Sequence, residues 1–253
     1  MEQNEFLGKK IFFLYPQSVI QDSMLDILIM SGFEVYTLHD HQRARRLLAH
    51  FLGSILFINI DQGLQEKEWE SYIRNIQEDP VAKESRLGIL SYNTDQKLME
   101  KYLMDLSVPC GYIQLKLGIQ TSTEILLTAL QANEAKGRRK CIRAFCVDDE
   151  YATMNYKGPD RMYYGKLLDI SSAGVAVRFD RPVTMPANTL LRGIQLKLRS
   201  VLIMTDGLLL GARQDDPHVR VILFAARMSQ KEKLAIHHYI KQRIQHHIDQ
   251  LNI

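Results

Sequence analysis

The chain has 253 residues, of which 46% are hydrophobic and 24% charged, a composition typical of globular proteins with one large or two ordinary domains. Its formal net charge is only +3, which argues against the strongly basic surface of a general nucleic-acid binder. The three cysteines form no CxxC pair and predict reduced thiols. The sequence has no signal peptide and no apolar run of about 18 residues, the length that spans a bilayer. We therefore expect a soluble, cytoplasmic protein.

The first half of the sequence alternates apolar runs with amphipathic segments. Strands are predicted at residues 9–15, 33–38, 54–60, 86–91 and 110–115, and helices at 18–32, 41–51, 67–77, 96–106 and from Thr121 onward. In the third helix, Trp69, Ile73 and Ile76 share one face. Repeated strand–helix pairs, with strands apolar on both faces, predict a parallel sheet covered by helices on both sides. We expect a doubly wound, flavodoxin-like α/β domain over residues 1–133.

Two of these helices carry a signal for where they end or begin. Gly32 follows the apolar positions of the first helix and is placed to end it. Thr121 and Glu124 have the spacing of a capping box, in which each side chain bonds the backbone N–H of the other residue. We therefore expect the last helix of this domain to begin at Thr121.

The pattern changes at residues 133–139, a polar linker that contains a glycine. Beyond it, short runs rich in β-forming residues are separated by turn residues. These runs cover residues 141–147, 163–170, 174–179, 189–199, 201–212 and 219–226. They predict a small antiparallel β-barrel, followed by a helix from about Lys231 to Leu251. The second predicted domain covers residues 134–253.

Two short polar patterns stand near the start of the predicted barrel. Arg139 and Arg143 are four residues apart, and the rigid arginine fork suits phosphate or the O6/N7 edge of guanine. Downstream, Asp169, Ser171 and Gly174 lie between two apolar runs. Taken singly, the first pattern is typical of a solvated basic linker. The second is typical of a hairpin turn, in which Gly174 would adopt a positive φ.

In this order, and separated by about 25 residues, the two patterns resemble the signature of the PilZ domain, the bacterial receptor module for cyclic di-GMP. That signature is RxxxR before a barrel, then [D/N]xSxxG at a strand end and turn. The resemblance covers about residues 136–230. It implies that Arg139 and Arg143 bind phosphate and guanine Hoogsteen edges, and that Asp169 and Ser171 fix the other side of the ligand. It also implies that Gly174 permits the turn.

Arg138 precedes the motif, and whether it contacts the ligand or is a solvated charge stays open. The resemblance implies an effector of the second messenger that carries out no chemical step and needs no cofactor. Ligand binding would order the linker and reorient the domains toward a protein partner, in control of motility, surface behaviour or virulence. Two alternatives stay open: a signalling adaptor whose barrel binds no ligand, and a nucleic-acid-binding regulator that uses the basic linker.

The first domain resembles the receiver domain of response regulators. Asp61 follows the third predicted strand, Ser91 the fourth and Lys116 the fifth, where the family has its phosphoacceptor aspartate, a Ser/Thr and a lysine. The acidic pair expected after the first strand is replaced by Tyr15 and Pro16. Without those carboxylates Mg²⁺ lacks most of its protein ligands. We therefore expect a receiver-like scaffold that is not phosphorylated.

The predicted last helix contains four of the eight histidines, His237, His238, His246 and His247. No two of them have the i,i+4 spacing of a helical metal pair, and we expect no metal site. The apolar residues of this helix recur at near-helical spacing. They could pack on the barrel or mediate self-association, so the oligomeric state stays open.

Overall fold

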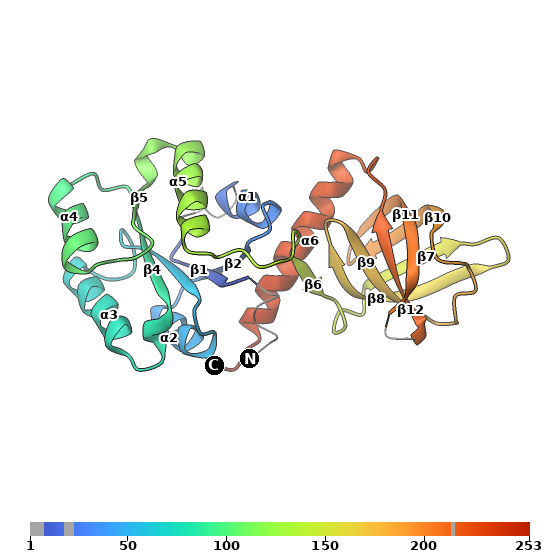
Figure 1. The fold of residues 1–253 in the computed structure, drawn as a ribbon, viewed down its shortest axis with the longest axis horizontal. Helices are drawn as coiled ribbons and strands as arrows, with labels where there is room; N and C mark the ends of the chain where they lie inside the picture. Colours follow the sequence, from blue (N-terminus) through green and yellow to red (C-terminus); the bar gives the residue numbers. More distant parts are fainter. Residues whose placement is uncertain (1–7, 18–22, 214–215) are drawn as a thin grey trace. The chain divides into compact units, whose positions relative to one another are not determined.

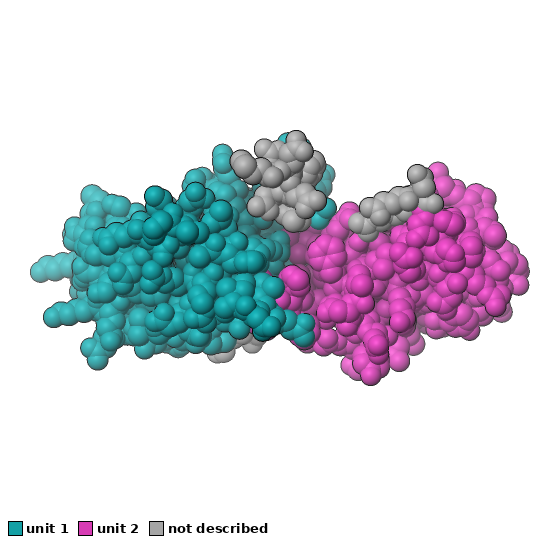
Figure 2. Space-filling model, turned by 90° about the horizontal axis from the view of Figure 1, so that it is seen from below, with its two compact units in different colours: residues 1–140, 250–253 teal, residues 141–249 magenta. Residues whose placement is uncertain are grey.

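The structure is a computed structural model that describes residues 8–17, 23–213 and 216–253. The chain divides into two compact units, coloured separately in Figure 2. The N-terminal unit comprises residues 1–140 and 250–253, and the C-terminal unit comprises residues 141–249. The two units are described one at a time.

A parallel five-stranded sheet forms the centre of the N-terminal unit (Figure 1). Its strands are β1 (Lys10–Leu14), β2 (Glu34–Leu38), β3 (Ile55–Asn59), β4 (Arg86–Ser91) and β5 (Tyr112–Gln114). The helices are α1 (Leu25–Met30), α2 (His41–His50), α3 (Glu66–Glu78), α4 (Gln96–Glu100), which continues as a π-helical turn over Lys101–Asp105, and α5 (Ile119–Ala132). The strand order β2-β1-β3-β4-β5 is that of the flavodoxin-like fold, which confirms the predicted doubly wound domain.

The burial of this unit follows the sequence pattern. Residues 11–14 of β1 and all of β3 are buried, as expected of strands covered on both faces. On α3, Trp69, Ile73 and Ile76 are completely buried, as predicted. On α1, Leu28 is buried but Ile27 is exposed. Residues 18–22 of the predicted first helix lie outside the described residues.

The two helix-end predictions have different outcomes. Gly32 has a φ of +88° and donates its N–H to the carbonyl of Ile29 at 2.9 Å, which confirms that it ends α1. The prediction that α5 begins with a capping box at Thr121 is wrong. The helix begins two residues earlier, after Gly118, whose φ is +89°. Thr121 lies within the first turn of α5, so its backbone already follows the helix and it cannot serve as the cap.

Seven antiparallel strands build the C-terminal unit (Figure 1). They are β6 (Arg143–Phe145), β7 (Ala152–Lys157), β8 (Met162–Ser171), β9 (Gly174–Phe179), β10 (Thr189–Leu198), β11 (Val201–Arg213) and β12 (Asp216–Phe224). The order β8-β7-β10-β11-β12-β9 closes into a barrel because β9 also pairs with β8. β6 pairs with the C-terminal part of β8, beyond the part that pairs with β7. The predicted antiparallel barrel is confirmed.

The sequence pattern missed β7. The strand alternates buried Ala152, Met154 and Tyr156 with more exposed neighbours, which is the period-two signal of a half-buried strand. Its polar residues hid that alternation. The predicted strand over residues 141–147 is also shorter than expected, because only its middle three residues form β6.

The final helix, α6 (Gln230–Asp249), confirms the predicted helix to within two residues at each end. Its apolar side chains pack against β6, β8 and β11. Buried along one stripe are Ile236, Tyr239, Ile240, Ile244 and Ile248. This confirms packing on the barrel, and self-association stays a prediction. No helix among the described residues is long and apolar enough to cross a bilayer.

Candidate functional site

β6, β8 and β9 bring together most of the residues of the two polar motifs. Arg143 is the first residue of β6 and lies opposite Ser171 of β8. Ser171 in turn lies opposite Gly174, the first residue of β9. Directly paired residues of an antiparallel sheet share a face and have Cβ atoms about 5 Å apart. One register row across three strands therefore joins the second arginine of RxxxR to the serine and glycine of DxSxxG.

The two arginines of RxxxR belong to different parts of the chain. Arg139 is exposed and lies in the linker, within the N-terminal unit, which ends at Lys140. Arg143 is also exposed, but it belongs to β6 and thus to the C-terminal unit. Arg143 thus belongs to the strand predicted over residues 141–147, and its backbone is held by pairing with β8. Three residues separate the two arginines.

The acidic and hydroxyl residues of the second motif are nearly covered. Asp169 is 6% and Ser171 is 8% exposed. The hydroxyl of Ser171 donates to the carbonyl of Gly174 at 3.2 Å and accepts from the N–H of Ala173 at 3.3 Å. These bonds close the β8–β9 turn. They also leave the exposed guanidinium of Arg143 as the most accessible polar group of this row.

Gly174 is required for a different reason from the one predicted. Its φ is not positive, because the turn is made by the two residues before it and Gly174 is already paired as part of β9. A Cβ atom at this position would lie 2.3 Å from the carbonyl oxygen of Ile222 and 3.1 Å from the Cα of Leu223. Gly174 thus permits the close approach of β9 to β12.

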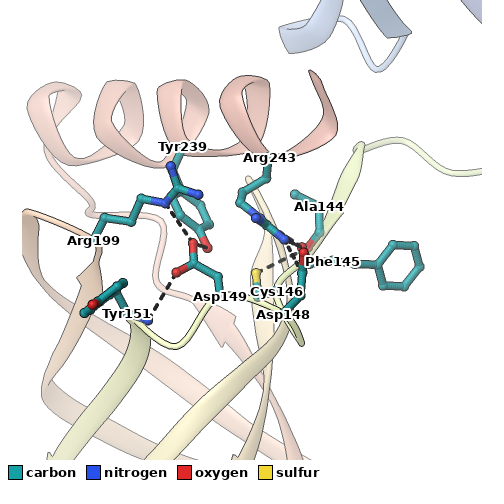
Figure 3. A network of polar contacts seen from close by, with 9 residues as sticks. All are labelled: Ala144, Phe145, Cys146, Asp148, Asp149, Tyr151, Arg199, Tyr239 and Arg243. Atoms are coloured by element: carbon teal, nitrogen blue, oxygen red, sulfur yellow. Dashed lines mark hydrogen bonds and ion pairs between the residues drawn. The ribbon is translucent and has the colours of Figure 1, made fainter. Parts of the chain in front are cut away.

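Behind β6, a polar network that sequence reasoning missed joins α6 to the chain after this strand (Figure 3). Arg243 of α6 is only 4% exposed, and its Nε and Nη2 atoms each donate to the carbonyl of Phe145 at 3.2 Å. Its Nη2 also pairs with the carboxylate of Asp148. One feature of the sequence could have indicated this network. Arg243 stands four residues after Tyr239, within the apolar stripe of a helix, where a charged side chain needs a buried partner.

Asp149 accepts three hydrogen bonds in the same network. The donors are the hydroxyl of Tyr239 at 3.0 Å, the Nε of Arg199 at 3.0 Å and the N–H of Tyr151 at 3.1 Å. Burial alone would raise the pKa of Asp149, but the bonds from these three donors outweigh it and lower the pKa below its usual value. The carboxylate is therefore charged, and it fixes α6 to the loop that follows β6.

Cys146 lies beside this network and is buried. Burial raises the pKa of its thiol to about 11, and a hydrogen bond with Tyr239 and the charge of Arg243 only partly oppose that shift. A buried thiol with a raised pKa is unreactive. Among the described residues, no cluster of three or more His, Cys, Asp or Glu side chains could hold a metal ion.

In the N-terminal unit, the structure joins two of the three receiver positions. The hydroxyl of Ser91 donates to Oδ1 of Asp61 at 2.5 Å, and the N–H of Tyr92 donates to Oδ2 at 2.7 Å. Lys116 is exposed in the turn after β5. Within the described part of the chain, Lys116 forms no hydrogen bond or ion pair with Asp61. Among the described residues, the carboxylate is therefore held by Ser91 at the end of β4 and by Tyr92 directly after it.

An aromatic side chain, Tyr15, directly follows β1, where a receiver domain would have its acidic pair. Tyr15 has a φ of +52°, and its ring contacts Gly63, where a Cβ atom would lie 2.5 Å from Cε2 of the ring. The hydroxyl of Tyr15 is 3.1 Å from Nδ1 of His41. The rings of Tyr15 and His41 both pack near Trp69, with centroids 6.1 and 6.3 Å away. We call Tyr15, His41 and Trp69 the aromatic cluster.

Comparison with known proteins finds no matching family model and no matching curated protein. Solved structures similar to the chain include the PilZ domain of YcgR from Escherichia coli with c-di-GMP, at 13% identity and a TM-score of 0.38, covering 45% of this chain and 99% of that one. They also include the Bacillus subtilis inhibitor of motility MotI/DgrA, at 15% identity and a TM-score of 0.36, covering 45% of this chain and 53% of that one.

A third similar structure is the receiver domain of an HD domain-containing protein from Pseudomonas fluorescens. Its identity is 17% and its TM-score 0.41, covering 51% of this chain and 99% of that one. The chain spans only 45% of the length of YcgR in its complex with c-di-GMP. At these identities and TM-scores we draw no functional conclusion from the likeness.

Proposed function

We propose that this chain is a PilZ-type receptor for cyclic di-GMP, a bacterial effector that binds the second messenger at the start of its barrel. The observation that carries the proposal is the joint occurrence of RxxxR and DxSxxG, with Arg143 and the second motif on paired strands. Arg143, Ser171 and Gly174 share one register row, and Asp169 precedes Ser171 by two residues on β8. A cation, a carboxylate and a hydroxyl therefore meet on one face of a rigid sheet.

The chemistry of these groups matches the ligand. Cyclic di-GMP carries two phosphates and two guanines. Arg139 and Arg143 supply the rigid forks that bind phosphate or the O6/N7 edge of guanine. Asp169 accepts hydrogen bonds from N1 and N2 of guanine, and Ser171 donates to a sugar or phosphate oxygen. Arg138 adds a further cation beside Arg139 in the linker.

Transmission of the signal follows from the division of RxxxR between the two units. Arg139 is in the N-terminal unit and Arg143 in the C-terminal unit. A ligand that engages both arginines orders the three residues between them and restrains the orientation of one unit against the other. A protein partner reads that orientation, in control of motility or surface behaviour, and the chain itself carries out no chemical step.

Isothermal titration calorimetry with cyclic di-GMP tests this function. We expect the intact chain to bind and Arg143→Ala to weaken binding by a factor of about 10 to 100, the loss expected of one bidentate arginine. Lys140→Ala is the matched control, because it removes a cation from a variable position of the same RxxxR motif. Absence of binding by the intact chain would contradict the proposal and favour the ligand-free adaptor.

We also propose that the N-terminal unit is a receiver-like scaffold that is not phosphorylated. The aromatic cluster supplies no carboxylate for Mg²⁺, and phosphoryl transfer to Asp61 needs that metal to neutralise charge. Incubation with acetyl phosphate and Mg²⁺ should leave the mass of the intact protein unchanged, while a phosphorylatable receiver domain treated in parallel gains a phosphoryl group. An adduct that Asp61→Ala abolishes would overturn this proposal.

A further inference from the structure

The C-terminal unit has an open hollow beside the β7–β8 hairpin, which is drawn in yellow in Figure 1. The hollow has a volume of about 440 Å³. Its walls come from the start of β8 and from the chain that follows β9. We call it the hairpin hollow, and its lining residues are Arg161, Met162, Tyr163, Tyr164, Asp180 and Arg181.

The walls of the hairpin hollow are held in place before any ligand binds. The buried Tyr163 donates its hydroxyl to Asp160 at 3.1 Å and lies 3.2 Å from the hydroxyl of Thr184. The guanidinium of Arg161 lies over the ring of Tyr163, 4.9 Å from its centroid. The Nη2 atom of Arg161 donates to the carbonyl of Pro182 at 3.2 Å. A preformed hollow of this kind costs little ordering entropy when a partner binds.

The outward side chains of β8 give the hollow an apolar surface. Met162 is 41% and Tyr164 is 51% exposed, on either side of the buried Tyr163, so both point away from the barrel core. Tyrosine and methionine are enriched at protein–protein interfaces. Anchor residues of such interfaces are commonly aromatic side chains beside a pocket. Tyr164 and Met162 therefore offer a contact for an apolar side chain of a partner.

Cations surround this apolar contact. Lys157 lies opposite Met162 on β7, Lys166 follows Tyr164 by two residues on the same face of β8, and Arg181 lines the hollow itself. All three are exposed, and none of them pairs with a carboxylate anywhere in the described part of the chain. Asp180 is the one carboxylate among the lining residues. Asp160, bonded to Tyr163, adds a second carboxylate. The rim still has a net positive charge, because these three cations and Arg161 outnumber the two carboxylates.

We propose that the hairpin hollow is the docking site for an acidic segment of a protein partner. One aromatic or aliphatic side chain of that segment contacts Met162 and Tyr164, and flanking carboxylates pair with Lys157, Lys166 and Arg181. The apolar centre favours a protein over a nucleic acid, whose phosphates would need a continuous line of cations. The inference deepens the proposed function, since it identifies the surface through which the effector reaches its partner.

Selection from a phage-displayed library of random peptides of about twelve residues tests this proposal on the full chain. The library is first depleted on the double variant Tyr164→Ser/Arg181→Glu, which removes peptides that bind other surfaces of the chain. We expect the enriched peptides to combine several carboxylates with one aromatic or aliphatic anchor. As synthetic peptides, they should bind the double variant and Lys157→Glu/Lys166→Glu at least about tenfold more weakly, a loss of about 1.4 kcal/mol. The control variant Lys231→Glu reverses the charge of an exposed residue on α6, and it should bind the peptides as the intact chain does.

Three outcomes would overturn the docking site. One is enriched peptides without acidic character, and a second is peptides that bind the intact chain and both double variants equally. The third is binding of duplex DNA or of phosphatidylglycerol vesicles that the double variants abolish, when no peptide is enriched. Calorimetry with cyclic di-GMP on Tyr164→Ser/Arg181→Glu separates the two proposals. The double variant should bind the dinucleotide as the intact chain does. An intact chain that binds the dinucleotide but no acidic peptide would contradict only the docking site, and an intact chain that binds the peptides but not the dinucleotide would contradict only the receptor function.

Discussion

Gly174→Ala is expected to lower the free energy of unfolding of the C-terminal unit by about 3 kcal/mol, at the upper end of the usual cost of overpacking. The added Cβ atom would lie 2.3 Å from the carbonyl oxygen of Ile222, which is backbone of β12 and cannot rotate away. β9 is paired on both sides, with β8 and with β12, so it cannot shift without losing one of its ladders. Native-state hydrogen exchange of the full chain, measured by mass spectrometry on peptides from β9 and β12, reports this change.

Gly211→Ala is the matched control for this substitution. Gly211 also lies in a strand of the barrel, β11, but a Cβ atom there would have no neighbour within 4 Å and the φ of Gly211 is not positive. Alanine at this position should leave the exchange of the barrel unchanged or slow it slightly, because it restricts the unfolded chain. Equal destabilisation by both substitutions would show that close approach of β9 to β12 is not the reason for Gly174.

The second large effect is expected for Arg243→Met, which should destabilise the C-terminal unit by about 2–3 kcal/mol. Methionine is close to the arginine stem in volume, so the packing of α6 is largely kept. The carbonyl of Phe145 loses both guanidinium donors, and Asp148 loses its ion pair. Faster hydrogen exchange in peptides from β6 and α6, with little change in β10, is the measurement that checks it.

Arg199→Met provides the comparison from the same network. Arg199 also bonds a carboxylate, that of Asp149, but its side chain is 44% exposed. Asp149 keeps the bonds from Tyr239 and Tyr151 when Arg199 is removed. Loss of such a part-exposed ion pair costs about 1 kcal/mol or less. If the two substitutions destabilise the unit equally, burial of Arg243 is not what holds α6 to β6.

The sequence was sufficient to predict both folds because their patterns are local. Strands β1 and β3 are apolar at nearly every position, and each is followed by an amphipathic helix, which points to a parallel sheet without any knowledge of distant contacts. β7 was not predicted because half of its residues are polar. Only the alternation of buried side chains shows that it is a strand. The start of α5 was misplaced because the φ of Gly118 outweighs a side-chain capping pattern two residues later.

The candidate site was predictable only as a pattern of residue types. The spacing of RxxxR and DxSxxG is in the sequence, and the pairing of Arg143 with Ser171 follows once β6 and β8 are known to be neighbours. The reason for Gly174 depends on β12, which lies almost 50 residues away. Arg243 acts on Phe145, 98 residues away, and no local pattern predicts such a contact. Side chains that work through distant backbone groups are therefore the part that sequence reasoning could not supply.

The aromatic cluster also has an optical consequence. Trp69 is the only tryptophan of the chain, it is completely buried, and its indole N–H donates to the carbonyl of Gln62 at 3.1 Å. Fluorescence excited at wavelengths that tryptophan absorbs and tyrosine does not therefore comes from the N-terminal unit alone. The barrel has tyrosines but no such chromophore. A change of this emission on adding cyclic di-GMP would thus report, in the N-terminal unit, a ligand whose proposed contacts on β6 and β8 lie in the C-terminal unit.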